Sequence, residues 1–340
     1  MHTPSQLQDI ARTLLASKKG IFAVDESPRT MQKRLALAGV EHGTEEDADA
    51  LREMLFGAAG LGEYISGAIL YESSLTRTAK DSTPLAELLR AQGIVLGVKV
   101  DKGLAPLFAQ GETEESATSE QVSRGLDTLS ERLPAFYEQG VRFTKWRSVF
   151  AITDTHPTGV CMHANAHVLA QYAAIVQSHG MVPMVEPEVL YEGEHSLARS
   201  QEVIENVLRV LFETMAEYNV DLSGVILKTS MALSGKQSGV EHTPKEVAES
   251  TLSAFEASVP EGVAGIVFLS GGQTPEQATK NLDAIAKAHN NTWPVTFSYS
   301  RAIEEEAIVV WKGKEENVPA AREVLLARLE KLVAAQGGEL

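Results

Sequence analysis

The sequence predicts an α/β protein built as a closed (β/α)8 barrel, the TIM barrel, with an extra helix at each end. Short apolar runs alternate with longer helical patterns along the chain, and this alternation builds parallel sheets. The apolar runs number eight, which fits a closed barrel better than an open sheet. No Pro/Gly/Ser-rich linker divides the 340 residues, so we expect a single domain over residues 1–340.

The predicted strands are spaced so that a helix fits between each and the next. In chain order they are residues 20–27, 65–73, 93–101, 141–150, 181–190, 222–231, 263–272 and 293–301. Helical patterns begin near residues 82, 243 and 274, and others cover residues 120–138, 164–178 and 196–218. Thr243 and Thr274 each precede a proline and an acidic first turn, which is a typical helix start.

The two ends of the chain and two acidic segments complete the predicted order of elements. Apolar residues at helical spacing predict an N-terminal helix over residues 4–17, which we expect to cover one end of the domain. An amphipathic tail helix is predicted over residues 319–336. Residues 111–119, rich in Glu and Thr, predict an exposed loop, and residues 41–49 predict an acidic connection.

The composition excludes several classes of function. The chain has 30 Lys and Arg against 46 Asp and Glu, a formal net charge of −16, which argues against general binding of nucleic acid or anionic membranes. The single cysteine, Cys161, excludes an internal disulfide framework and a cysteine-rich metal site. No apolar run approaches the roughly 18 residues of a spanning helix, and the N-terminus lacks a secretory pattern. We expect a cytoplasmic protein that meets any anionic substrate with a local basic cluster.

One lysine stands out because of its place at the end of an apolar strand. The segment Ser223-Gly-Val-Ile-Leu-Lys-Thr-Ser230 is apolar up to Lys228. An amine that is desolvated beside another cation becomes a nucleophile toward carbonyl groups. By itself, Lys228 is equally explained as a structural lysine that reaches solvent or pairs with a carboxylate. The neighbouring strands decide between these interpretations.

Polar residues recur at the ends of the other predicted strands. They are Asp25 and Ser27, Lys99 and Asp101, Lys145 and Arg147, and Glu186 and Glu188. Residues at i and i+2 share one face of a strand, and barrel enzymes carry their sites at the carboxyl ends of the strands. Inward charges must be paired or functional, so we expect these pairs to converge on one rim. Lys145 and Lys228 lie on alternate strands and are expected in the same layer.

The last two strands end in a different composition that favours phosphate binding. Small residues and an arginine follow strands seven and eight in Ser270-Gly-Gly272 and in Ser298-Tyr-Ser-Arg301. Glycines let backbone N–H groups approach an anion, and barrels commonly bind phosphate after these two strands. With a nucleophilic lysine and carboxylates that shuttle protons, the predicted chemistry is a Schiff base that serves as an electron sink for breaking a C–C bond.

Seven motifs carry a resemblance to a known family over about residues 11–313. They are Ala23-Val-Asp-Glu-Ser27, Gly97-Val-Lys-Val-Asp-Lys-Gly103, Lys145-Trp-Arg147, Val185-Glu-Pro-Glu188, Ile226-Leu-Lys228, Leu269-Ser-Gly-Gly-Gln273 and Phe297-Ser-Tyr-Ser-Arg301. In order and spacing they resemble the class I fructose-1,6-bisphosphate aldolases. The resemblance implies reversible cleavage of fructose 1,6-bisphosphate to dihydroxyacetone phosphate and glyceraldehyde 3-phosphate in glycolysis and gluconeogenesis. It also implies no metal, no cofactor, sugar phosphates as binding partners, and a homo-oligomer, often a tetramer.

The resemblance assigns catalytic roles to five residues. Lys228 is expected to be the Schiff-base nucleophile and Glu186 the acid/base that assists its formation and dehydration. Asp25 is expected to act on the C4 hydroxyl during cleavage. Lys145 and Glu188 are expected to position Lys228 and tune its proton.

The resemblance also assigns residues to the two phosphate groups of the substrate. Arg147 is expected to be a supporting contact in the site. The C1-phosphate site is matched by Ser270, Gly271, Gly272, Ser298 and Arg301. The other phosphate is matched by Ser27, Thr30 and Lys99.

The chain departs from the family pattern at four places. Ser300 replaces the family glycine before the strand-eight arginine, which is expected to alter a backbone contact to phosphate. Thr229 follows the nucleophile where proline is frequent, and Thr30 replaces a serine but keeps the hydroxyl. The chain ends at Gly337-Gly-Glu-Leu340, without the terminal tyrosine of animal and plant enzymes, so another acid or water is expected to protonate the enamine.

Three alternatives stay open at this point. A metal-dependent aldolase would use His156, His163 and His167, of which the last two are spaced to share one face of a helix. Another lysine-dependent barrel, a transaldolase or keto-acid aldolase, predicts one phosphate or carboxylate site in place of two phosphate sites. A sugar-phosphate-binding barrel without activity predicts loss of Lys228 or Glu186, and both are present.

Overall fold

A computed structural model describes residues 4–108 and 119–340, and these residues form a closed barrel of eight parallel strands. The strand order around the barrel is β1-β10-β9-β8-β7-β6-β3-β2. The strands are β1 (Gly20–Val24), β2 (Ile65–Leu70), β3 (Val95–Lys99), β6 (Val141–Phe150), β7 (Val182–Val189), β8 (Ile226–Thr229), β9 (Gly265–Phe268) and β10 (Val295–Tyr299). Each lies within one of the eight predicted runs, and the predicted fold class is confirmed.

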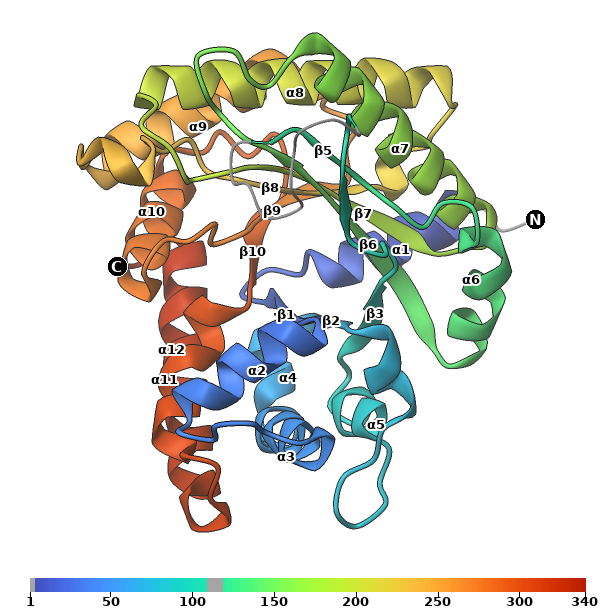
Figure 1. Ribbon diagram of the computed structural model, residues 1–340, viewed down its shortest axis with the longest axis vertical. Coiled ribbons are helices and arrows are strands. Elements are labelled where there is room, and N and C mark those ends of the chain that lie inside the picture. Colours follow the sequence, from blue (N-terminus) through green and yellow to red (C-terminus); the bar gives the residue numbers. More distant parts are fainter. Residues whose placement is uncertain (1–3, 109–118) are drawn as a thin grey trace.

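Helices surround this barrel and fill the connections between its strands (Figure 1). The longer ones are α2 (Pro28–Leu37), α3 (Glu45–Phe56), α6 (Leu129–Glu138), α7 (Gly159–Ser178), α8 (Leu197–Glu217), α9 (Pro244–Ser258), α10 (Pro275–Ala288), α11 (Arg301–Trp311) and α12 (Val318–Gln336). Shorter helices are α4 (Leu61–Tyr64) and α5 (Leu85–Arg90). Thr243 and Thr274 are the N-caps of α9 and α10 and form capping boxes with Glu246 and Gln277, as the sequence pattern predicts.

Several predicted boundaries differ from the structure. The helix predicted over residues 120–138 begins only at Leu129, because residues 121–123 form β5, which pairs with β4 (Leu104–Pro106) in an antiparallel hairpin. The predicted acidic connection at residues 41–49 contains the start of α3, where Thr44 and Asp47 form a capping box. The loop predicted at residues 111–119 lies outside the described residues except for Ser119, which is buried.

The N-terminal helix α1 (Pro4–Leu14) closes one end of the barrel and ends before the expected residue 17. Its buried side chains form one apolar cluster with the inward-facing residues of the strands. The cluster contains Leu7, Ala11, Leu14, Leu15, Ile21, Ala23, Ile69, Phe143, Val182, Met184, Ile226 and Val267. A second, larger cluster fills the space between the strands and the outer helices. The barrel interior is therefore a packed core and not a channel.

Along two of the strands, the inward-facing residues change from apolar to charged toward the carboxyl end of the strand. On β6 the inward Phe143 is followed at i+2 by Lys145, and on β8 the inward Ile226 is followed by Lys228. Gly97 on β3 leaves room for the Phe143 ring, because a Cβ at Gly97 would lie 2.2 Å from that ring. The apolar cluster inside the barrel therefore lies directly beneath the charged side chains at the carboxyl ends of the strands.

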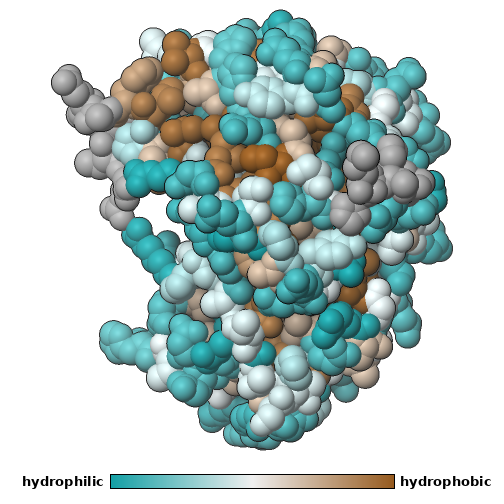
Figure 2. All heavy atoms as spheres, turned by 90° about the vertical axis from the view of Figure 1, so that its right-hand side faces the viewer, coloured by the Kyte–Doolittle hydropathy of each residue, from teal (hydrophilic) through white to brown (hydrophobic). Residues whose placement is uncertain are grey.

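The outer surface has one feature that bears on assembly. Figure 2 shows the side of the molecule on which α6 and α7 lie in Figure 1, and hydrophobic side chains gather in the upper part of this view. Over its 20 residues α7 contains no Asp, Glu, Lys or Arg, and Val160 near its start is 59% exposed. In the part of the chain that the structure describes, no helix is both long enough and apolar enough to cross a membrane.

Candidate active site

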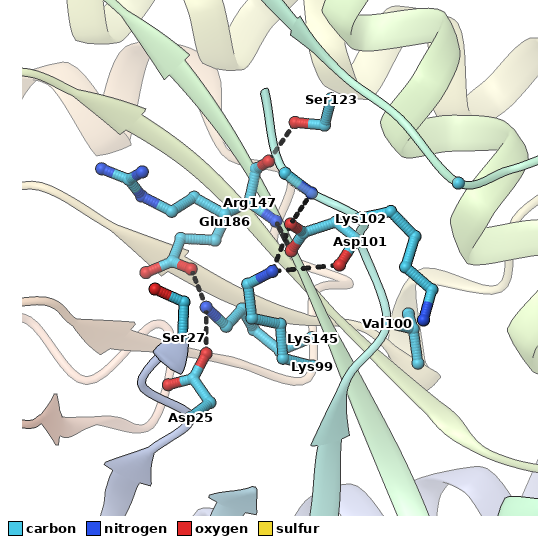
Figure 3. Close-up of polar contacts among 12 residues, drawn as sticks. Asp25, Ser27, Lys99, Val100, Asp101, Lys102, Ser123, Lys145, Arg147 and Glu186 are labelled. Carbon is cyan, nitrogen blue, oxygen red and sulfur yellow. Dashed lines mark hydrogen bonds and ion pairs between the residues drawn. The ribbon is translucent and has the colours of Figure 1, made fainter. Parts of the chain in front are cut away.

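Lys145 stands at the centre of the charged groups at the barrel mouth (Figure 3). Its Nζ lies 2.7 Å from Oδ2 of Asp25 and 2.9 Å from Oε2 of Glu186. Asp25 follows β1, and β1 is not a neighbour of β6 in the sheet, so the first contact crosses the mouth of the barrel. Lys145 and Glu186 are each only 4% exposed. The predicted convergence of these strand-end charges is therefore seen in the structure.

At Lys145 and Glu186, burial disfavours the charged form of the side chain, but the opposite charges beside it favour that form more strongly. Burial disfavours the ammonium of Lys145, but Asp25 and Glu186 more than offset it and hold the pKa of Lys145 far above its ordinary value. Burial likewise disfavours the carboxylate of Glu186, but the cations Lys145 and Lys228 lower the pKa of Glu186. Lys145 therefore keeps its proton at neutral pH, and Glu186 stays ionised.

Lys228 shares the Glu186 carboxylate with Lys145. Its Nζ lies 3.1 Å from Oε1 of Glu186, while Lys145 contacts Oε2 of the same side chain. Lys228 is also 4% exposed. Within residues 4–108 and 119–340, Glu186 is the only carboxylate that forms an ion pair with Lys228, whereas Lys145 has two. The two buried amines therefore have unequal negative charge beside them.

Glu188 lies at the same rim but faces Arg147. Nε of Arg147 is 2.6 Å from Oε2 of Glu188, and no ion pair joins Glu188 to Lys228 among the described residues. The hydroxyl of Ser123 on β5 donates to the backbone carbonyl of Arg147, so the β4–β5 hairpin is tied to this part of β6 (Figure 3). The resemblance places Glu188 beside Lys228, but in the structure its charge is matched by Arg147.

Asp101 organises the ends of β3 and β6 around Lys99. Oδ1 of Asp101 accepts hydrogen bonds from Nζ of Lys99 at 2.5 Å and from the backbone N–H of Gly103 at 3.2 Å (Figure 3). Oδ2 accepts from the backbone N–H of Arg147 at 3.3 Å. Asp101 is 6% exposed, so this carboxylate is a buried anchor. A phosphate that binds Lys99 must therefore compete with Asp101.

The residues expected at the two phosphates lie in two separate places. Ser27 caps α2, where its Oγ accepts from the backbone N–H of Thr30 at 3.3 Å and lies 3.1 Å from the Thr30 hydroxyl. Gly271 and Gly272 have φ angles of 50° and 86°, which only glycine adopts readily. A Cβ at Gly272 would lie 4.0 Å from Nη2 of Arg301, so this backbone and this guanidinium share one edge of the mouth.

Ser270 and Ser298 are the two serines expected beside Arg301 at the C1 phosphate. The Oγ of Ser298 is buried and has no hydrogen-bond partner among the described residues. In the same part of the chain, no hydrogen bond joins the side chain of Ser270 or Ser298 to Arg301. Arg301 is exposed at the start of α11, where a guanidinium and a helix N-terminus both favour an anion.

The three histidines of the metal alternative do not form a cluster. His163 and His167 are exposed on α7, and the His167 ring packs edge-on against Tyr218. His156 lies 3.5 Å from Glu120. Over the described ranges, no group of three His, Cys, Asp or Glu side chains is arranged to hold a metal ion.

The sequence analysis missed a buried polar cluster beside the mouth. It joins Glu26, Arg34, Ser300 and Glu304. A signal for it was present, because Glu304 begins the buried i, i+3, i+4, i+7 stripe of α11 that continues with Ala307, Ile308 and Trp311. An acid on an apolar face needs a partner, and Arg34 supplies one at 2.6 Å.

The fold and the site together define a class of enzyme. Buried amines served by carboxylates at the carboxyl ends of barrel strands are suited to attack a carbonyl group and to move the protons that this attack requires. Such an arrangement is typical of barrel lyases that work through a lysine Schiff base.

Comparison with known proteins identifies the family. Residues 6–340 match the model of the glycolytic class-I fructose-bisphosphate aldolases. The chain is 44% identical over 327 residues to a probable fructose-bisphosphate aldolase class 1 of Xanthomonas axonopodis pv. citri, covering 96% of both chains. It is 44% identical to a fructose-bisphosphate aldolase of Drosophila melanogaster, covering 95% of this chain and 88% of that one.

Solved structures agree with this result. The fructose-bisphosphate aldolase of Plasmodium falciparum, solved in complex with TRAP and a small-molecule inhibitor, matches with a TM-score of 0.94 and 38% identity over 100% of this chain and 97% of that one. The chain belongs to the class-I fructose-bisphosphate aldolase family. Enzymes of this class cleave fructose 1,6-bisphosphate reversibly through a lysine Schiff base, and the resemblance drawn from the seven motifs is confirmed.

Proposed function

We propose that this chain performs the reaction of its family with Lys228 as the amine that attacks the C2 carbonyl of fructose 1,6-bisphosphate. The observation that carries the assignment is the sharing of one carboxylate by two buried lysines. Lys145 lies between Asp25 and Glu186 and keeps its proton, so the amine available for attack is that of Lys228.

Glu186 is the proton carrier for Schiff-base formation in this proposal. The ionised Glu186 first accepts a proton from the Lys228 nitrogen, which it contacts. Attack by the free amine gives a carbinolamine, and Glu186 returns this proton to the carbinolamine hydroxyl, which leaves as water. The resulting iminium withdraws electrons from the C3–C4 bond. Asp25 removes the proton from the C4 hydroxyl, the C3–C4 electron pair moves onto the enamine, and glyceraldehyde 3-phosphate leaves. Protonation of the enamine and hydrolysis then release dihydroxyacetone phosphate and restore Lys228.

The two phosphates are proposed to bind two different sets of residues at the mouth. The first set, at the C1 phosphate, consists of Ser270, Gly271, Gly272, Ser298 and Arg301. Gly272 and Arg301 support this assignment because they share one edge of the mouth. The second set consists of Ser27, Thr30 and Lys99, of which the first two form the N-terminal cap of α2. Arg147 and Glu188 are proposed as a paired support of the site.

The decisive experiment is borohydride trapping with dihydroxyacetone phosphate in excess EDTA, followed by peptide mass mapping. The expected result is one stable adduct on Lys228. Lys228→Met should give no adduct, whereas Lys236→Met, which removes an exposed lysine next to α9, should be labelled like the natural chain. Cleavage that is lost in EDTA without any adduct would move the site to the histidines. An adduct on Lys145 alone would overturn the division of roles between the two lysines.

We also propose a cytoplasmic location and a homo-oligomer. The first is supported by a single buried cysteine, which suits a reducing compartment. The second is supported by α7, which contains no Asp, Glu, Lys or Arg and exposes Val160 near its start. A helix with such a face is typically covered by a neighbour. Nucleic acid is not expected as a partner, given the net charge of −16.

A further inference from the structure

Four side chains, three of them buried and one half-buried, link the connection after β1 to the connection after β10. We call them the Ser300 cluster: Glu26, Arg34, Ser300 and Glu304. The hydroxyl of Ser300 donates to Oε1 of Glu26 at 2.7 Å, with Oε1 of Glu304 as a more distant acceptor at 3.2 Å, and it accepts from Nη2 of Arg34 at 3.2 Å. Nε of Arg34 donates to Oε1 of Glu304 at 2.6 Å. The three ionisable members are between 2% and 8% exposed.

The cluster lies directly behind two groups that we assign to the reaction. Glu26 follows Asp25 and precedes Ser27, and Ser300 precedes Arg301. Strands β1 and β10 are neighbours in the barrel, so the two connections leave the sheet side by side. The single hydrogen bond from Ser300 to Glu26 therefore joins the backbone that carries Arg301 to the backbone that carries Asp25. A glycine at position 300 has no hydroxyl with which to make this bond.

The charges of the cluster do not balance. One guanidinium faces two carboxyl groups, and a second buried carboxylate without its own cation is costly. Burial, followed by the neighbouring Glu26, raises the pKa of Glu304 well above its ordinary value. Oε1 of Glu26 lies 3.7 Å from Nε of Arg34, farther than Oε1 of Glu304. The Glu304 carboxyl therefore keeps its proton at pH values at which an ordinary glutamate has lost it.

Among the described residues, Arg34 is the only cation paired with Glu26 or Glu304. Arg34 comes from α2, Glu26 from the connection after β1, and Glu304 and Ser300 from α11 and its start. On α12, which packs against α11, Arg328 donates to the backbone carbonyl of Ala302 and to Thr279 and does not reach Glu304 among the described contacts. The ionisation state of the cluster is thus decided within the cluster.

We propose that the Ser300 cluster is a positioning device that sets Arg301 relative to Asp25 for a substrate with a phosphate at each end, and that it does so only while the carboxyl group of Glu304 is protonated. Loss of that proton places a second negative charge behind the phosphate cradle and breaks the match with Arg34. The inference rests on the proposed role of Arg301 in binding the C1 phosphate. Ser300 and Glu304 touch neither substrate nor reacting atoms, so they are positioning residues.

Steady-state kinetics across mildly acidic to alkaline pH test this proposal. Ser300→Gly should raise KM for fructose 1,6-bisphosphate by roughly tenfold, since it removes a hydrogen bond to a charged group, with kcat changed less than about twofold. Glu304→Gln keeps the shape of the side chain but cannot ionise, so it should abolish the rise of KM at alkaline pH. Glu306→Gln removes the same charge from an exposed position of the same helix and should leave the alkaline rise unchanged.

The outcomes separate this inference from the proposed function. An alkaline KM profile of Glu304→Gln that parallels those of the natural chain and Glu306→Gln would overturn the dependence on the Glu304 proton. An unchanged KM in Ser300→Gly would overturn the positioning role. If Ser300→Gly fails to fold, the comparison of the two glutamine variants still decides. An unchanged KM in Arg301→Ala would instead refute the phosphate cradle, and the borohydride adduct on Lys228 is independent of both.

Discussion

At the scale of single residues, two chemically identical lysines of the site differ in the carboxylates that lie beside them. Lys145 has two carboxylates within 2.9 Å, and Lys228 shares one of these at 3.1 Å. The same amine is therefore a fixed cation in one place and a nucleophile in the other. In the proposed mechanism the charge of Lys145 holds Asp25 and Glu186, whereas Lys228 gives its lone pair to the substrate.

This division predicts different results when each lysine is replaced by methionine. Lys228→Met should abolish turnover and leave stability nearly unchanged, because Glu186 keeps its contact with Lys145. Lys145→Met should also impair turnover, but it leaves Asp25 without a cation and Glu186 with Lys228 alone, and should cost about 3–5 kcal/mol of unfolding free energy. Urea unfolding and cleavage assays check both. Equal stability of the two variants would contradict the argument.

The guanidinium of Arg301 predicts a change in binding more than in chemistry. Arg301→Ala should raise KM for fructose 1,6-bisphosphate by roughly ten- to a hundredfold, since a charge-assisted hydrogen bond to phosphate is lost. The same variant should affect a ketose without a C1 phosphate much less. Comparing KM for the two substrates measures the difference. Equal losses on both would place Arg301 outside the phosphate site.

At the scale of elements, sequence reasoning located the strands better than the connections. The eight strands were predictable because each is an apolar run whose burial is fixed by the barrel, and Lys145, Glu186 and Lys228 stood out as charges on such runs. The β4–β5 hairpin was missed because its strands are each three residues long and carry no alternating pattern. Its function in tying Ser123 to β6 depends on tertiary contact.

The Ser300 cluster shows a second kind of limit. Its members come from positions 26, 34, 300 and 304, and no local pattern joins residues so far apart in the chain. Glu304 on the apolar stripe of α11 was visible in the sequence, but its partner was not. Similarly, the pairing of Glu188 with Arg147 required the register of β6 and β7.

Helix α1 predicts a clean separation of stability from activity. Leu14 is fully buried in the apolar cluster at the closed end of the barrel, opposite the site. Leu14→Ala should cost about 2–5 kcal/mol of unfolding free energy, through lost burial and a cavity, with kcat/KM unchanged within about twofold. Leu37→Ala, at a 43% exposed position on α2, is the matched control and should change stability by less than about 0.5 kcal/mol.

At the scale of the whole molecule, two glutamates give opposite dependences of stability on pH. The pKa of Glu186 is lowered, so its stabilisation is present above the ordinary glutamate value of 4.5 and is lost as the pH falls toward the folded value. The pKa of Glu304 is raised, so its contribution is full below 4.5 and is lost as the pH rises toward the folded value. The fold is therefore weakened by acid at one site and by base at the other.

Thermal unfolding as a function of pH checks the second effect. The difference in Tm between Glu304→Gln and the natural chain should move in favour of the glutamine variant as the pH rises above 4.5, because glutamine has no proton to lose. Glu306→Gln should show a difference that does not depend on pH in this way. A constant difference for Glu304→Gln would mean that this carboxyl group ionises at its ordinary pKa.

The outward face of α7 offers a test of the proposed homo-oligomer. A helix of 20 residues without Asp, Glu, Lys or Arg is a poor solvent-facing surface, and Val160 on it is 59% exposed. Val160→Arg should therefore shift the sedimentation of the protein toward smaller species, because burying an unpaired guanidinium in an interface is costly. Val309→Arg, at a 48% exposed position on α11, is the matched control and should leave assembly unchanged.

Dissociation by Val309→Arg alone would move the interface to α11, and a natural chain that sediments as a monomer would refute the oligomer. Because Lys145, Glu186 and Lys228 meet inside one barrel, the smaller species should keep Schiff-base formation on Lys228.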